Sequence, residues 1–135
     1  MKLTNLQILD SANALQILEK QKFPVKLSWK ISTALGALTP FAEKTNKFIN
    51  EVQMKYAERD EKGELIQGTD EKGELSPNTF KITIENIEKA NKEITDLLLE
   101  TVEVSNVEMS LDDFPETFEV EPQIMKNLSP LFETK

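Results

Sequence analysis

The sequence contains no cysteine and no histidine, and only one tryptophan and one tyrosine among its 135 residues. The missing side chains exclude disulfide bonds, thiolate nucleophiles, zinc sites of the Cys/His type and every mechanism that needs an imidazole base. The sequence also lacks any uninterrupted apolar run of about 18 residues, so it predicts no membrane-spanning helix. Its N-terminal stretch lacks the apolar core of a signal peptide, and we therefore expect a cytoplasmic protein.

Carboxylates are plentiful, but no histidine, phosphate-binding glycine loop or recognisable convergent serine accompanies them. The four glycines are isolated from one another. We therefore expect a protein that is not an enzyme, with no catalytic residue, no cofactor and no metal ion. Catalysis by two carboxylates stays open at this stage, because a sequence does not show which side chains meet in space.

Apolar residues at helical spacing predict three helices. The first covers residues 4–21 and has Thr4 as its N-cap. The second is long and covers about 24–58, with a kink or a fresh start at Pro40. The third covers 83–99. A helix of roughly 35 residues reaches about 50 Å, so the long helix needs an antiparallel partner or a second subunit to cover its apolar stripe.

Turn-rich and alternating segments predict a small β component. Asp60–Leu65 repeats identically as Asp70–Leu75, and each Asp-x-x-Gly pattern is typical of a turn, so we expect a β-hairpin or meander over about 60–82. Period-two alternation predicts short strands over about 101–111, with a turn at Ser105-Asn106. A proline-containing tail, 112–135, follows.

These elements predict a mainly helical α+β fold with a single domain over 1–135. In it, the long kinked helix packs antiparallel on a second helix, the hairpin projects, and the short strands close one end. The apolar tail, with a short helix near 122–129, would pack across its own domain or a neighbour's.

Charge is divided unevenly along the chain. Residues 1–55 carry eight lysines and four acids, whereas residues 56–135 carry eight basic residues and twenty acids. Between Lys92 and Lys126 there are ten acids and no basic residue. This run is typical of a solvated acidic surface, and it also fits a face that docks on a basic partner or imitates nucleic-acid phosphate. The overall acidity argues against direct nucleic-acid binding.

Two groups of residues form the candidate interaction surface. The first group consists of a tryptophan and an apolar stripe on the long helix, and the stripe also suggests a homodimer. The second consists of carboxylates from the acidic run. The surface comprises Trp29, Phe41, Phe48, Ile49, Val52, Glu103, Glu108, Asp112, Asp113 and Glu116.

The opening Met1–Asn5, the segment Phe23–Lys30 and the stretch from Ile87 to Val104 together resemble an uncharacterised short-protein family of Gram-positive bacteriophages and prophages. The resemblance spans most of the chain and is weaker in the tail. It implies a phage origin and the cytoplasm of a host cell, and it transfers no catalytic residue.

We therefore expect a non-catalytic phage or prophage protein that acts by protein–protein interaction. Its role would be that of a virion-assembly or accessory factor, which could make it virion-associated, or that of an inhibitor of a host protein. The alternative is an acidic mimic that occupies a nucleic-acid site on a host enzyme. The two differ in what they need, because a mimic requires a continuous row of exposed carboxylates and an interaction module requires an apolar contact patch.

Overall fold

The structure is a computed structural model that describes residues 1–64, 66–69 and 75–132, and it confirms the mainly helical α+β fold class. The chain divides into two compact units. The first, here called the core unit, joins Met1–Lys44 to Leu98–Lys135, and the second, here called the helix-pair unit, is Thr45–Leu97. This division does not test the expectation of a single domain, which stays a prediction.

Helix α1 (Asn5–Glu19) begins at the cap that the sequence predicts. The backbone N–H of Gln7 donates to Thr4 Oγ1 at 3.1 Å, and the backbone N–H of Thr4 donates to Gln7 Oε1 at 2.9 Å. This reciprocal capping box satisfies N–H groups that the helix leaves without an internal partner. The helix therefore starts at a fixed residue, which aligns its buried side chains with the core.

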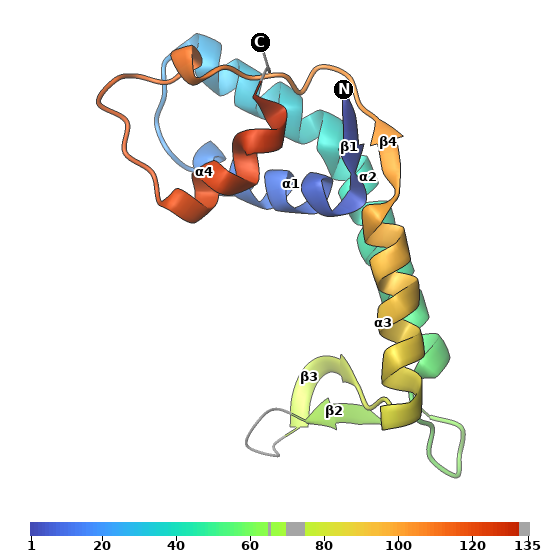
Figure 1. The fold of residues 1–135 in the computed structure, drawn as a ribbon. Coiled ribbons are helices and arrows are strands. Elements are labelled where there is room, and N and C mark those ends of the chain that lie inside the picture. The colour runs from blue at the N-terminus through green and yellow to red at the C-terminus, as the bar shows by residue number, and fades with distance from the viewer. Residues whose placement is uncertain (65, 70–74, 133–135) are drawn as a thin grey trace. The chain divides into compact units, whose positions relative to one another are not determined.

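Helix α2 (Val25–Tyr56) is continuous through Pro40 and contributes residues to both units (Figure 1). Pro24 precedes its first residue, where a missing N–H costs nothing. In the core unit, Leu27, Ile31 and Leu38 are almost completely buried. Their spacing places them on one face of the helix, and that face packs in the same cluster as α1.

The C-terminal tail completes the core unit. Helix α4 (Pro122–Leu128) lies against α1, and Ser11 Oγ of α1 donates a hydrogen bond to the Asn127 carbonyl at 3.0 Å (Figure 1). Leu128 and Leu131 are fully buried. The tail thus packs across its own unit, which agrees with the role expected from its apolar residues. The fifteen buried hydrophobic residues of this core are Leu3, Ile8, Ala12, Ala14, Leu15, Leu18, Leu27, Ile31, Ala34, Leu38, Val104, Val107, Met109, Leu128 and Leu131.

The predicted strands over 101–111 are only partly correct. Strand β4 (Thr101–Glu103) is present, but it pairs antiparallel with β1 (Lys2–Thr4), a strand that sequence periodicity did not predict. The second predicted strand, 107–111, is wrong: Met109 makes a single bridge to Phe132, and Leu111–Asp113 is a 3-10 turn. Val107 and Met109 follow the period-two pattern because both side chains are buried in the core. Their backbone makes only the single bridge at Met109 and does not form a strand ladder.

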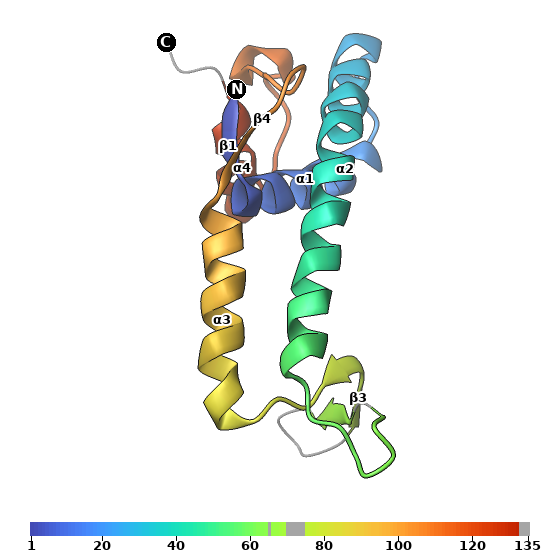
Figure 2. The ribbon, with the colours of Figure 1, turned by 90° about the vertical axis from the view of Figure 1, so that its right-hand side faces the viewer.

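The helix-pair unit consists of the second part of α2, a hairpin and α3 (Ile84–Leu99, of which the residues up to Leu97 belong to this unit). Within this unit α2 and α3 run antiparallel, as predicted (Figure 2). Lys55 Nζ lies 3.0 Å from Glu93 Oε1, which links the two helices. Val52 and Ala90 are the hydrophobic residues that the structure shows as buried in the described part of this unit.

The predicted hairpin is present as β2 (Gln67–Thr69) and β3 (Leu75–Phe80), which pair antiparallel. The first Asp-x-x-Gly turn also forms as expected. Asp60 Oδ1 accepts hydrogen bonds from the backbone N–H groups of Lys62 and Glu64, and Gly63 adopts a positive φ of 79° that favours glycine. The second copy of the turn, Asp70–Glu74, lies outside the described residues.

Candidate functional site

The predicted apolar stripe of α2 does not form one exposed patch. Phe41 packs against the core of its unit, Val52 is 5% exposed and Ile49 is half-buried. Phe48, at 44%, is the member of this stripe that stays exposed. The expectation of a continuous contact stripe is therefore corrected, because packing within each unit covers most of it.

Trp29, in contrast, is 68% exposed, although a tryptophan at such a helical position is more often packed in a core. It lines a hollow of about 350 Å³ together with Lys30, Thr33, Asn106 and Glu108. Asn106 has a positive φ of 66°, a conformation that a short polar side chain tolerates. We call this feature the tryptophan hollow. It combines a large exposed ring with a cation and a carboxylate.

Next to this hollow, Lys30 forms an ion pair with Asp113, with 2.8 Å between Nζ and Oδ1. Asp113 Oδ2 also accepts the backbone N–H of Ser110 at 2.9 Å. Partial burial raises the pKa of Asp113, but the hydrogen bonds from Lys30 and Ser110 and the lysine charge outweigh it, so the pKa lies below its usual value. The pair joins α2 to the turn that begins the tail.

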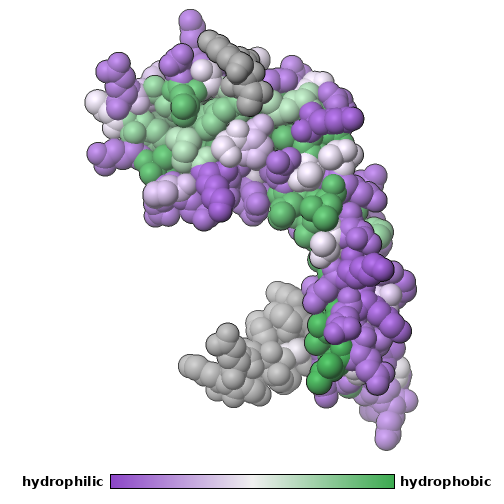
Figure 3. Space-filling model, in the orientation of Figure 1, coloured by the Kyte–Doolittle hydropathy of each residue, from purple (hydrophilic) through white to green (hydrophobic). Residues whose placement is uncertain are grey.

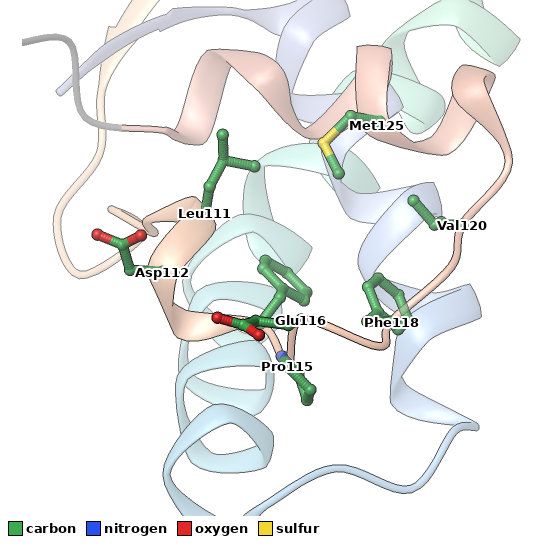
Figure 4. A pocket seen from close by; sticks show the side chains of 8 residues that line it. Leu111, Asp112, Pro115, Glu116, Phe118, Val120 and Met125 are labelled. Carbon is green, nitrogen blue, oxygen red and sulfur yellow. The ribbon is translucent and has the colours of Figure 1, made fainter.

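On the tail itself lies a pocket of about 330 Å³, here called the tail pocket. Figure 4 shows Leu111, Met125, Val120 and Phe118 around it, with the carboxylates of Asp112 and Glu116 at its side. Pro115 and Phe114 complete its lining. The pocket is therefore apolar inside and acidic at its edge.

An aromatic cluster holds the pocket wall in place. The rings of Phe114 and Phe118 stack with their centroids 5.3 Å apart, and Phe23 meets Phe118 edge-on at 5.2 Å. Phe114 also contacts Phe132 edge-on. Such ring pairs stabilise beyond the area that they bury, so the segment that carries Pro115 and Glu116 is anchored on both sides although it lacks regular structure.

The ten acids between Lys92 and Lys126, here called the acidic run, do not form one continuous surface of free carboxylates. Glu93 and Asp96 lie in the helix-pair unit, and the other eight acids lie in the core unit. Glu103 pairs with the N-terminal ammonium at 2.9 Å, Asp113 pairs with Lys30, and Glu93 pairs with Lys55. Glu108, Asp112 and Glu116 are exposed and make no ion pair within the part of the chain that the structure describes. These three carboxylates lie at the tryptophan hollow and the tail pocket, and Asp96, Glu100, Glu119 and Glu121 are exposed elsewhere along the run.

Of the ten predicted surface residues, four line the tryptophan hollow or the tail pocket of the core unit: Trp29, Glu108, Asp112 and Glu116. A fifth, Asp113, lies beside them through its ion pair with Lys30. Sequence reasoning did not assign the apolar pocket residues Leu111, Phe118, Val120 and Met125 to a site. Phe118 and Met125 were recognisable as apolar anchors of the tail, but nothing in their spacing distinguishes a pocket wall from a packed core.

Within the described ranges, no group of three or more metal-ligating side chains is placed to hold a metal ion. None of the helices in those ranges combines the length and apolar character needed to cross a membrane. Comparison of the chain with protein-family models, with curated proteins and with solved structures finds no match. The resemblance to a phage family therefore stays an expectation, and the site is interpreted from its own chemistry.

Proposed function

We propose that this chain is a non-catalytic interaction protein whose core unit binds a partner protein through the tail pocket and the tryptophan hollow. The observation that carries the proposal is the tail pocket, an apolar hollow of about 330 Å³ with exposed carboxylates at its edge. Apolar pockets with a few placed polar groups are the usual form of a binding site.

The chemistry of the two hollows indicates what kind of partner they fit. Tryptophan is enriched among the residues that dominate binding energy, and an exposed ring beside a hollow offers a large contact area at low entropic cost. Asp112 and Glu116 favour a cation near the pocket entrance. We therefore expect a partner segment that inserts an apolar side chain and carries lysine or arginine next to it.

The biological setting of the proposal rests on the family resemblance. We propose a phage or prophage protein in the cytoplasm of a host cell, serving virion assembly or inhibiting a host protein. The alternative of a nucleic-acid mimic has less support, because Glu93, Glu103 and Asp113 are already engaged in ion pairs within the chain. Engaged carboxylates do not present a free row of phosphate-like charges.

Affinity purification of the tagged chain from phage-infected cells tests the proposal. Two substitutions, Trp29→Ala and Leu111→Ala, remove exposed apolar contact from each hollow, and Leu111 is 61% exposed, so its truncation leaves folding intact. The matched control is Ile17→Ala, which removes a 47%-exposed side chain of the same unit that lines neither hollow. We expect the two site variants to recover the partner at least about tenfold less well, and the control to match the original chain.

The identity of the captured protein separates the roles. Virion proteins in the eluate favour assembly, and a host nuclease or polymerase favours inhibition. If free DNA displaces the captured protein and the Trp29→Ala variant still binds it, the result supports the nucleic-acid mimic and contradicts the interaction module. Equal recovery by all three variants contradicts the proposed site.

A further inference from the structure

Helix α3 carries an apolar strip that its contact with α2 leaves open. Ile84 is 87% exposed and Ile87 is 41% exposed, while Asn91 is exposed and Ile94 half-buried. In Figure 3 a hydrophobic strip follows α3 over the helix-pair unit. We call Ile84, Ile87, Asn91 and Ile94 the α3 seam.

The seam lies beside the face that meets α2 and runs along its edge. Glu93 pairs with Lys55 of α2, and Ala90 is 2% exposed, so these two residues mark the covered face. Neighbouring positions on a helix are turned by about 100°, which directs Asn91 away from that face, whereas Ile94, four residues after Ala90, borders it and is half-buried. The seam is therefore available to something other than the helix-pair partner.

The spacing of the seam identifies the occupant as a helix. Its residues follow one another at intervals of three and four, which is the a/d repeat by which two helices pack side by side. The apolar stripe of α3 that covers its own unit is centred on Ala90, and the seam extends it on one side, where Ile84 and Ile87 stay exposed. A single asparagine at one a position is a known means of fixing the alignment and number of paired helices.

The seam is also nearly symmetric about that asparagine. Ile87 precedes Asn91 by four residues and Ile94 follows it by three. We propose that the occupant is a second copy of this chain, with two α3 helices antiparallel and a two-fold axis at Asn91. Each asparagine amide has donors and an acceptor, so the two amides satisfy one another across the axis, and Ile87 packs against Ile94 of the second copy.

Charges beside the seam suit the same arrangement. Glu88 and Lys92 are exposed and flank the seam on its side away from α2. In an antiparallel pair, Glu88 of one copy lies beside Lys92 of the other, and the two-fold axis repeats this contact. A parallel pair would instead turn Glu88 toward the Ala90 side of the second helix, which offers it no lysine. This contact belongs to the helix-pair unit and does not depend on the partner site of the core unit.

Light scattering on the full chain at high micromolar concentration tests the contact. We expect a mass of twice the 15.4 kDa of one chain. Ile87→Glu is expected to return the mass to that of one chain, with the helical circular dichroism unchanged. The matched control, Phe48→Glu, alters an exposed side chain of α2 in the same unit and is expected to leave the dimer intact. A one-chain mass for the original sequence, or dissociation by Phe48→Glu alone, overturns the proposal.

Single cysteines test the geometry directly, because the chain has none of its own. Asn91→Cys is expected to give a disulfide-linked dimer on mild oxidation, since its two copies meet at the axis. Ile84→Cys is expected to give none, because its copies stand about 21 Å apart in an antiparallel pair, well beyond disulfide reach. Lys89→Cys, on the opposite face of α3, is the second negative control. Cross-linking by Ile84→Cys equal to that of Asn91→Cys, or none by Asn91→Cys, overturns the antiparallel contact.

Discussion

The two units of this protein are stabilised in different ways. The core unit buries fifteen hydrophobic residues drawn from β1, α1, α2, the segment after β4 and the tail. The described part of the helix-pair unit buries Val52 and Ala90 and leaves Phe48, Ile84 and Ile87 exposed. Hydrophobic burial is the main favourable term in folding, and most of the burial seen among the described residues lies in the core unit.

This difference explains why the candidate sites are of different kinds. A rigid, well-packed unit can hold a pocket open, as the aromatic cluster does beside Phe118. In the helix-pair unit, α3 instead leaves Ile84 and Ile87 exposed to a neighbour.

The largest effect is expected from truncation in the core unit. Leu15 is fully buried, so Leu15→Ala should lower the free energy of unfolding by about 3 kcal/mol through lost burial and a cavity. The measurement is the urea midpoint followed by circular dichroism. Leu6→Ala on the same helix, where the side chain is 42% exposed, is the control and should cost about 0.5 kcal/mol. Equal costs for the two variants would show that α1 does not pack as described.

Removing a helix cap should also cost more stability in the core unit than in the helix-pair unit, although both losses should be smaller. Thr4→Ala removes a reciprocal capping box and should cost about 1 kcal/mol of stability. Thr83 Oγ1 accepts a single, longer hydrogen bond of 3.3 Å from the Asn86 N–H at the start of α3, so Thr83→Ala should cost less. Chemical denaturation of both variants provides the comparison. A larger loss for Thr83→Ala would reverse the ranking of the two units.

The ion pair of the core unit predicts a pH dependence. The pKa of Asp113 is lowered in the folded state, so its contribution is present above the unfolded pKa of about 3.9 and is lost as pH falls through the folded value. Because Lys30 is partly exposed, Asp113→Asn should cost only about 0.5 kcal/mol at neutral pH and nothing in strong acid. Unfolding curves at several pH values measure this. Asp112→Asn, at an exposed neighbour, is the control and should show no such trend.

The smallest effect is expected from the ion pair of the helix-pair unit. The hydrogen bond to Glu93 and its charge raise the pKa of Lys55, with a further contribution from Tyr56. A lysine whose pKa is raised on folding stabilises the folded state at pH values below its unfolded pKa. This stabilisation is lost as the pH rises through its folded pKa. Lys55→Met should therefore change the dependence of the free energy of unfolding on pH only in alkaline solution. Lys47→Met should leave this dependence unchanged. Because Lys55 is exposed, added salt should weaken the effect.

Much of the fold was predictable because its determinants are local. Thr4, Pro24 and the apolar spacing within α1, α2 and α3 act through neighbours a few residues away, so the helices were placed to within a few residues. The hairpin and the Asp60 turn were predicted for the same reason. Strand β1 was missed, because Lys2–Thr4 becomes a strand only by pairing with Thr101–Glu103 about a hundred residues later in the chain.

Local sequence patterns specify which segments become helices, that the chain is acidic toward its C-terminus, and that the tail is apolar enough to pack. Which apolar residues stay exposed depends instead on tertiary packing. Phe41 and Val52 have the same helical spacing as Phe48, yet packing covers the first two and not the third. The tail pocket and the α3 seam arise in the same way. Exposure depends on what packs from distant parts of the chain, and spacing along a single helix carries no information about that neighbour.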